Sequence, residues 1–182
     1  QPFFLAEMRC ARKLCDLSMA FEDADKDESA SSENEKLQQM ILAAEKKQRI
    51  TLSEDQREAL AMALEHGVTV ITGGPGTGKT TIIKTLLTVL EQNKGKALLA
   101  APTGRAAKRM NEATGWDAKT IHRLLEIQAG SLEEEGKQFF ARNASNPLEA
   151  DLIIVDESSM IDVVLMSHLL EAIPAGTRLV LL

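Results

Sequence analysis

A glycine-rich octapeptide, GGPGTGKT at residues 73–80, constrains the fold of this chain more than any other feature. It fits the pattern GxxxxGK followed by Ser or Thr, directly follows the apolar segment TVIT, and precedes a helical pattern. A loop of this kind joins a buried strand to a helix, because its backbone N–H groups must converge on a polyphosphate with no Cβ in the way. The sequence therefore predicts an α/β fold built around a phosphate-binding loop.

Short continuous apolar runs, separated by helical stretches, follow one another from residue 68 onward. Such runs are typical of strands that are buried on both faces of a parallel sheet and connected by crossover helices. Gly, Asn and Pro residues between 130 and 150 indicate a loop or hairpin there. We expect strands at 68–71, 97–101, 152–155 and 179–182, and helices at 79–92, 104–113, 120–128 and 161–173.

The first fifty residues have a different pattern, with helical spacing at 3–20 and again at 36–48. Between these helices, residues 22–35 hold seven carboxylates and one lysine, a composition that favours a mobile linker. We therefore divide the chain into a helical preamble at 1–50 and a main domain at 51–182. The first residue is Gln and the final apolar run ends without a turn or cap, so we expect a fragment whose main domain is truncated at its C-terminal end.

The net charge of −6 hides a local excess of basic residues. The acidic stretch at 22–35 alone accounts for −6, so the remainder of the chain sums to zero. Within that remainder, residues 94–123 carry seven Lys or Arg and two carboxylates, a local charge of +5. A basic strip of this kind favours a polyanionic partner such as nucleic acid. The strip consists of Lys94, Lys96, Arg105, Lys108, Arg109, Lys119 and Arg123.

Composition and hydropathy exclude several other classes of protein. With 44% hydrophobic and 26% charged residues, the chain is neither collagenous nor fully disordered. No apolar run approaches the roughly 18 to 20 residues that a membrane-spanning helix needs, and the N-terminus lacks the pattern of a signal peptide. We therefore expect a cytoplasmic protein.

The glycine-rich loop predicts a nucleotide site with distinct roles for two of its residues. Lys79 is expected to reach the β- and γ-phosphates, and the hydroxyl of Thr80 is expected to help hold Mg²⁺. The alternative is a turn that only connects a strand to a helix, and the complete motif in its strand-to-helix context argues against that reading. The residues expected at the nucleotide are Gly73, Gly74, Pro75, Gly76, Thr77, Gly78, Lys79, Thr80 and Thr81.

The acidic motif DLIIVDESSM places Asp156 and Glu157 at the end of a predicted strand. In an open parallel sheet, ligands gather at the carboxyl ends of the strands, so Asp156 is expected to face the same crevice as Lys79. Asp156 can hold Mg²⁺ there, and Glu157 can orient and deprotonate an attacking water. The alternative is a solvated acidic pair at a strand end. The pair favours a hydrolase over a small-molecule kinase, which needs no water-activating glutamate.

Gln56 lies near the start of an amphipathic helix expected at 54–65, and it has two readings. With Ser53 it forms a capping-box pattern, in which the two side chains satisfy backbone N–H groups of the first helical turn. Its carboxamide also matches the hydrogen-bonding edge of adenine. The sequence leaves both readings open.

Two further segments follow predicted strands and are therefore expected at the same edge of the sheet. In AAPTGRAA, the side chains of Thr103 and Arg105 and the backbone around Gly104 can contact phosphates. In TIHRL, Thr120 and His122 are the corresponding candidates. The alternatives are a capped helix start with an exposed arginine, and a histidine with only a structural hydrogen bond.

The succession of LSEDQREAL, GGPGTGKT, LLAAPTGRAAKRM, KTIHRLL and NPLEADLIIVDESSMID resembles the RecD-like branch of superfamily 1 DNA helicases. The resemblance covers residues 52–182 and implies the first RecA-like motor domain, a P-loop NTPase with a mainly parallel sheet flanked by helices. It implies that ATP and Mg²⁺ are the cofactors, that Gln56 contacts adenine, and that Lys79, Asp156 and Glu157 are catalytic. The DNA-binding residues that it implies are Pro102, Thr103, Gly104, Arg105, Thr120 and His122.

The resemblance also implies ATP-driven 5′ to 3′ movement on single-stranded DNA, in recombination and repair at the bacterial nucleoid. The expected partners are single-stranded DNA, duplex–single-strand junctions and other repair proteins. In the RecA-like order, the strand at 179–182 lies between those at 68–71 and 152–155. The second RecA-like domain with its arginine finger is not in this sequence, so we expect the isolated chain to bind Mg-ATP and hydrolyse it slowly.

Two other functions remain open from the residues alone. One is another P-loop NTPase that handles nucleic acid, such as an RNA helicase, because the basic strip suits RNA equally. The other is a nucleotide-dependent interaction module that does not hydrolyse its ligand.

Overall fold

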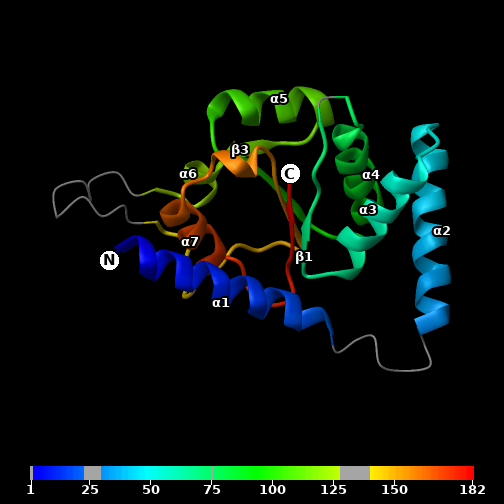
Figure 1. Cartoon of the computed structure of the whole chain (residues 1–182). Helices are drawn as coiled ribbons and strands as arrows, with labels where there is room; N and C mark the ends of the chain where they lie inside the picture. Colours follow the sequence, from blue (N-terminus) through cyan, green and yellow to red (C-terminus); the bar gives the residue numbers. More distant parts are fainter. Residues whose placement is uncertain (1, 23–29, 75, 128–139) are drawn as a thin grey trace.

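The computed structural model describes residues 2–22, 30–74, 76–127 and 140–182 of the chain. Within them, five parallel strands form one sheet with helices on both faces (Figure 1). The expected α/β class, with a mainly parallel RecA-like sheet, is therefore confirmed. The strands are β1 (Val68–Val70), β2 (Ala97–Ala101), β3 (Ala118–Thr120), β4 (Leu152–Val155) and β5 (Arg178–Leu181). The α-helices are α1 (Pro2–Glu22), α2 (Ala30–Gln48), α3 (Glu54–Glu65), α4 (Lys79–Gln92), α5 (Gly104–Thr114), α6 (Ile121–Leu124) and α7 (Val163–Glu171).

The strands follow the order β1-β5-β4-β2-β3 across the sheet, and each neighbouring pair is parallel. The prediction that the last strand lies between β1 and β4 is confirmed, with β5 one residue earlier than expected at each end. The carboxyl ends of the parallel strands meet at one edge of the sheet. The candidate site is built at that edge.

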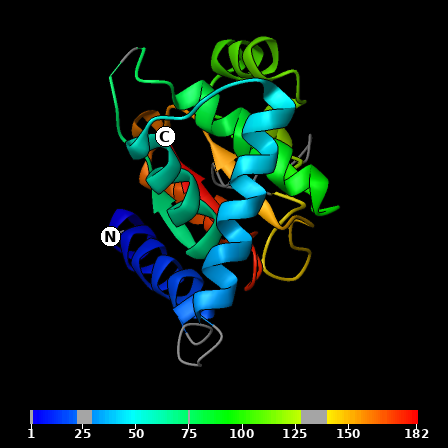
Figure 2. The ribbon, with the colours of Figure 1, turned by 90° about the vertical axis from the view of Figure 1, so that its right-hand side faces the viewer.

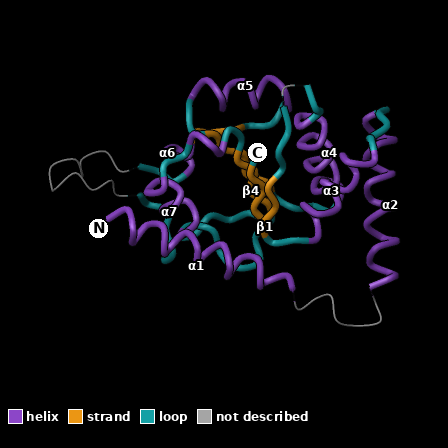
Figure 3. Tube along the Cα trace, in the orientation of Figure 1, coloured by secondary structure: helices purple, strands orange, loops and turns teal. Residues whose placement is uncertain are grey.

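Successive residues of β4 point to opposite faces of the sheet and pack into two separate cores. Ile153 and Val155 lie in a core with α1, α6 and α7, whereas Leu152 and Ile154 lie in a core with α2, α3, α4 and α5. All four side chains are at most 1% exposed. The strands therefore form a middle layer between two layers of helices (Figure 3), which explains the uninterrupted apolar sequence of β4.

The two N-terminal helices pack on opposite faces of the sheet (Figure 1). Leu17 of α1 is fully buried, and Cys10 Sγ donates to the carbonyl of Val163 at the start of α7 (3.6 Å). On the other face, Gln48 Nε2 of α2 donates to the carbonyl of Lys84 in α4 (3.0 Å), and Figure 2 views the side that α2 covers. None of the described helices is both long and apolar enough to cross a bilayer.

Two helices after the first motif are shorter than the sequence predicted. The helix expected at 120–128 is replaced by β3 and the single turn of α6, because Glu126 adopts a left-handed backbone (φ 55°). The helix expected at 161–173 begins at Val163, because Asp162 caps it by accepting from two backbone N–H groups. The 3-10 turn η3 (Ser158–Met160) precedes that cap.

Both ends of the acidic linker expected at 22–35 are helical. Glu22 is the last residue of α1, and residues 30–35 form the first turns of α2, so the prediction was wrong there. Carboxylates near a helix N-terminus are favoured by the helix dipole, so this acidic composition is compatible with a helix start. Residues 23–29 lie outside the described part of the chain, as do residues 128–139, which include the first part of the loop expected at 130–150.

Candidate functional site

The glycine-rich loop connects β1 to α4 at the carboxyl edge of the sheet (Figure 1). Gly76 (φ 80°) and Gly78 (φ 86°) have the left-handed backbone that glycine adopts without strain. Gly78 precedes α4 without a side-chain cap, so the first N–H groups of this helix are available to a ligand. Lys79 Nζ donates to the carbonyl of Gly73 (2.7 Å), within the loop. Pro75 of the loop lies outside the described residues. The loop therefore has the backbone conformation and the cation, Lys79, that suit a polyphosphate.

Two other predicted loop residues stabilise the loop or continue it into the helix. Thr77 Oγ1 donates to the carbonyl of Gly74 (2.9 Å), which closes the loop on itself. Thr81 is half-buried in the first turn of α4, and its carbonyl accepts from Thr85 Oγ1 (2.9 Å).

A cleft of about 450 Å³ opens between the start of α4 and α5, and we call it the α5-side cleft. Thr80 at the start of α4 and Asp156 at the end of β4 both line it, although 76 positions separate them in the sequence. Hydroxyl and carboxylate oxygens are ligands that Mg²⁺ accepts, usually with phosphates and water completing the shell. Among the described residues, no cluster of three or more His, Cys, Asp or Glu side chains can hold a metal alone. The donor set therefore fits Mg²⁺ that arrives with a nucleotide.

Glu157 lies at the turn where the chain leaves β4. Its backbone is left-handed (φ 53°, ψ 39°), a conformation that is uncommon for a residue with a side chain and that concentrates at functional sites. Its N–H donates to Asp156 Oδ1 (2.9 Å), which holds the Asp156 carboxylate against the backbone of Glu157. The side chain is 30% exposed, and Oε1 accepts from Arg109 Nη1 of α5 (3.4 Å).

Gln56 joins α3 to the glycine-rich loop. The capping box is present, since Gln56 N donates to Ser53 Oγ (3.3 Å) and Ser53 N donates to Gln56 Oε1 (3.1 Å). The other end of the carboxamide, Nε2, donates to the carbonyl of Thr77 (3.3 Å). A Cβ at Gly78 would lie 2.1 Å from Nε2, so the glycine allows this close approach. Of the two readings, capping is confirmed, and the adenine contact stays a prediction.

A second, smaller cleft of about 250 Å³ lies on the α3 side of the loop, and Gln56, Thr77 and Lys79 line it together. The loop is thus flanked by two hollows, one beside α3 and one beside α5. Six of the predicted nucleotide and metal residues line these two hollows, although they come from three separate segments of the chain: Gln56, Gly73, Thr77, Lys79, Thr80 and Asp156.

Several predicted DNA residues have local partners. Thr103 caps α5 by accepting from Ala106 N (3.2 Å), and Thr120 caps α6 by accepting from Arg123 N (3.2 Å). The ring of His122 lies 6.1 Å from the buried ring of Phe140. These contacts agree with the structural alternatives and do not exclude DNA, so the DNA assignment stays a prediction. Of the remaining candidates, Pro102 is half-buried, and Gly104 and Arg105 are exposed at the start of α5.

Six of the seven basic residues of the strip expected at 94–123 fall into two groups. One group lies on α5 and consists of Arg105, Lys108 and Arg109. The other group lines a hollow of about 170 Å³ beside the edge strand β3 and consists of Lys96, Lys119, Arg123 and, from outside the predicted strip, Arg142. Acidic residues pair with three members of the second group: Glu149, Asp117 and Glu126. Acidic residues also pair with two members of the α5 group, Glu112 with Lys108 and Glu157 with Arg109. The α5 group is therefore distinguished by its place beside the cleft that Thr80 and Asp156 line, and not by a larger excess of positive charge.

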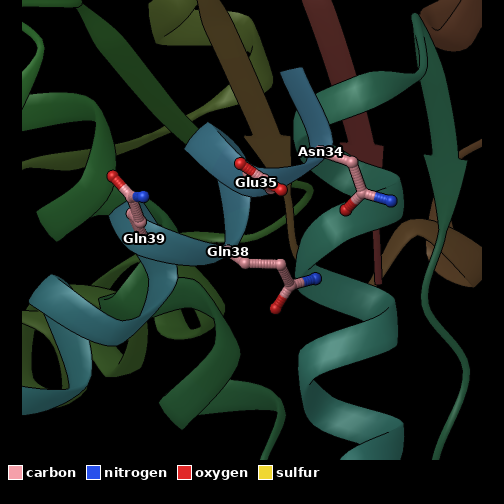
Figure 4. Close-up of a pocket in the computed structure, with 4 residues that line it drawn as sticks. All are labelled: Asn34, Glu35, Gln38 and Gln39. Carbon is pink, nitrogen blue, oxygen red and sulfur yellow. The ribbon is translucent and has the colours of Figure 1, made fainter. Parts of the chain in front are cut away.

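A larger hollow, of about 460 Å³, lies on α2 (Figure 4). Its lining consists of Asn34, Glu35, Gln38 and Gln39, which all come from the first half of that helix. None of these residues belongs to the predicted site, and α2 supplies no residue to the two clefts beside the loop.

A comparison with protein-family models matches residues 56–182 to a family described as an AAA domain. The chain belongs to this AAA domain family. The AAA domain begins at Gln56 and includes every predicted nucleotide and DNA residue, whereas α1 and α2 lie before it.

Two curated relatives of this AAA domain have high identity over a limited length. The ATP-dependent RecD2 DNA helicase of Deinococcus radiodurans is 44% identical over 139 residues, which cover 76% of this chain and 18% of that protein. The RecBCD enzyme subunit RecD of Mycolicibacterium smegmatis is 42% identical over 151 residues, which cover 70% of this chain and 26% of that protein. The resemblance to RecD-like proteins is confirmed, and the chain spans about a quarter or less of these relatives.

A solved structure of a Pif1 helicase, from work on DNA unwinding at forked double-stranded DNA, is similar to this AAA domain. The TM-score is 0.50 and the sequence identity is 25%, over 72% of this chain and 33% of that chain.

Sequence reasoning missed one side chain at the site. Arg109 had been grouped only with the basic strip, yet it contacts Glu157 and lines the α5-side cleft. Its spacing from Arg105 indicated only a shared helix face, since residues four apart on a helix are neighbours, and no local pattern indicated the contact with Glu157.

Proposed function

We propose that this chain is a motor domain of an ATP-dependent DNA helicase that moves 5′ to 3′ on single-stranded DNA in recombination and repair. The observation that carries the proposal is the cleft shared by Thr80 and Asp156, next to a loop whose glycines and Lys79 suit a polyphosphate. The names of the relatives, a RecD2 DNA helicase and a RecD subunit, support the same activity. Because the chain spans 18% and 26% of those proteins, the activity of the whole protein is part of the proposal.

The residues of this chain would bind ATP and direct water at its γ-phosphate. Lys79 would exchange the carbonyl of Gly73 for the β- and γ-phosphates, and Glu157 would orient the attacking water and accept its proton. Thr80 and Asp156 would hold Mg²⁺, which neutralises charge on the phosphate oxygens when it is bound. Every one of these groups lies at or beside the carboxyl edge of the sheet, so none needs a large movement to act together.

The nucleic-acid partner would lie along the start of α5, with single-stranded DNA and its junctions with duplex as the substrates. Arg105 is exposed there and four residues before Arg109, so the two guanidinium groups share a helix face. Phosphate contacts of this kind fix register without reading sequence. We place this activity in the bacterial cytoplasm, together with other repair proteins.

The experiment that tests the proposal measures ATP turnover by the full-length gene product with single-stranded DNA, with RNA of the same sequence, and with neither. We expect DNA to raise turnover, and we expect unwinding of a duplex that carries a 5′ tail. Stimulation by RNA alone would make the protein an RNA motor, and unwinding only from a 3′ tail would contradict the direction.

The DNA surface is tested with Arg105→Ala in the same protein. Each phosphate contact on a single strand contributes a slope of about −0.7 to the dependence of log affinity on log salt concentration. The variant is therefore expected to bind all sequences more weakly, with a slope shallower by about 0.7, and to bind ATP normally without DNA. A wild-type slope with a lower melting temperature would mean that Arg105 only braces α5.

A further inference from the structure

An ion pair connects α5, the helix of several DNA candidates, to the candidate catalytic carboxylate. Arg109 Nη1 of α5 lies 3.4 Å from Glu157 Oε1, and the two side chains are 63% and 30% exposed. The residues are 48 positions apart in the sequence, so the fold itself creates the contact. Thr103 caps the same helix, and Arg105 belongs to its first turn.

Arg109 occupies the space between the two candidate sites. It lines the α5-side cleft with Thr80 and Asp156, where the magnesium ion of a nucleotide is expected. It also follows Arg105 by four residues, so both side chains leave α5 on neighbouring parts of one face. The same guanidinium is therefore within reach of the nucleotide machinery and of the surface expected to bind DNA.

The chemistry of the contact allows exchange between two anions. A guanidinium binds carboxylates and phosphates with the same fork of donors, and an exposed ion pair is weak. A DNA phosphate that reaches α5 can therefore compete with Glu157 for Arg109. The backbone of Glu157 is held left-handed (φ 53°) and its N–H is bonded to Asp156, so the arginine is the more movable partner.

We propose that Arg109 is a positioning residue that couples DNA binding to ATP hydrolysis. Without DNA, its guanidinium holds Oε1 of Glu157 and keeps that carboxylate from the attacking water. When DNA binds along α5, Arg109 moves to a backbone phosphate and releases Glu157. This inference rests on the proposed function, since it needs both ATP hydrolysis at Glu157 and DNA on α5.

The test compares ATP turnover of wild-type and Arg109→Ala full-length gene product, with and without saturating single-stranded DNA. An exposed ion pair of this kind changes the ratio of paired to free Glu157 carboxylate by up to about fivefold. We therefore expect the variant to raise DNA-free kcat by about two- to fivefold and to leave DNA-saturated kcat and the KM for ATP nearly unchanged. The degree of stimulation by DNA falls accordingly. Arg109→Lys keeps one charge and is expected to lie between the two.

A matched control is available on the opposite side of the domain (Figure 1). Arg9 of α1 pairs with Glu171 at 3.6 Å, with exposed fractions of 61% and 35%, so the contact has nearly the same length and exposure. Arg9→Ala is expected to leave the stimulation by DNA unchanged. The inference is overturned if Arg109→Ala keeps or lowers DNA-free kcat, or if Arg9→Ala raises it equally.

The salt dependence of DNA binding tests the movement of Arg109 separately. If the guanidinium transfers to a phosphate, Arg109→Ala flattens the salt slope by about 0.7 on single-stranded DNA. A wild-type slope overturns the transfer, even if DNA-free turnover rises. A failure of the proposed function is distinguishable, because then wild-type protein shows no DNA-stimulated hydrolysis or Glu157→Gln hydrolyses ATP at the wild-type rate.

Discussion

Gln56 can be changed so that its two structural roles separate. Its Oε1 accepts from Ser53 N and completes the capping box of α3, whereas its Nε2 donates to the carbonyl of Thr77 in the nucleotide loop. Gln56→Glu keeps an acceptor at the capping position and removes the donor. Ser53→Ala does the opposite, since it removes the cap and leaves the carboxamide in place.

The two variants are expected to differ in both stability and affinity. Loss of an N-cap serine costs about 1 kcal/mol, or about 2–4 °C of melting temperature for a domain of this size. A glutamate at the third helical position suits a capping box and the helix dipole, so Gln56→Glu is expected to melt within about 2 °C of wild type. The hydrogen bond that Nε2 donates is lost in Gln56→Glu and kept in Ser53→Ala. A loss of about 0.5–1.5 kcal/mol is expected to weaken ATP binding by about 2- to 12-fold in Gln56→Glu.

Thermal unfolding by circular dichroism and calorimetric titration with a non-hydrolysable ATP analogue measure the two quantities on the same samples. Ser53→Ala is the matched control, because it alters the same helix start and is expected to bind the analogue like wild type. If Gln56→Glu binds the analogue with wild-type affinity, Gln56 only caps α3. If Gln56→Glu melts as low as Ser53→Ala, the reasoning about the capping acceptor is wrong.

Two further predictions concern stability. The carboxylate of Glu45 is 6% exposed and accepts from Leu52 N (2.7 Å) and from Arg57 (3.0 Å), so Glu45→Ala is expected to cost about 2–3 kcal/mol in urea unfolding at pH 7. Burial raises the pKa of Glu45, but the bonds from Leu52 and Arg57 outweigh it and lower the pKa overall. The stabilisation by Glu45 is therefore present above the pKa of the unfolded state, about 4.3, and is lost as the pH falls through the lower pKa of the folded state. The difference in unfolding free energy between variant and wild type should shrink below about pH 4, and a constant difference would contradict this. A Cβ at Gly67 would lie 2.0 Å from the carbonyl oxygen of Leu17, so Gly67→Ala is expected to displace α1 and cost about 1–3 kcal/mol, and an unchanged melting temperature would refute that packing.

Elements with strong local signals could be predicted from the sequence. The bounds of α3 and α4 were predicted to the residue, because the Ser53 cap and the glycines before Lys79 mark their starts. The bounds of β4 were also correct, since four buried apolar residues leave no competing pattern. The position of the glycine-rich loop between β1 and α4 was predictable for the same reason, because its motif carries the loop geometry with it.

Features that depend on distant partners could not be predicted. β3 has three residues, of which only Ala118 is buried, and it exists because it pairs with β2 at the edge of the sheet. The contact of Arg109 with Glu157 depends on how α5 is placed beside β4, which no local pattern encodes. The acidic start of α2 was misjudged because composition alone does not separate a linker from a charged helix start.

The central claim is that ATP bound at the glycine-rich loop is hydrolysed with the help of Glu157, and one paired measurement tests it most directly. ATP binding and ATP turnover are measured for Lys79→Ala and Glu157→Gln in the full-length gene product with single-stranded DNA. The account predicts that Lys79→Ala weakens binding, whereas Glu157→Gln keeps binding and loses turnover. An equal loss of binding in both variants, or wild-type turnover in Glu157→Gln, would contradict the account.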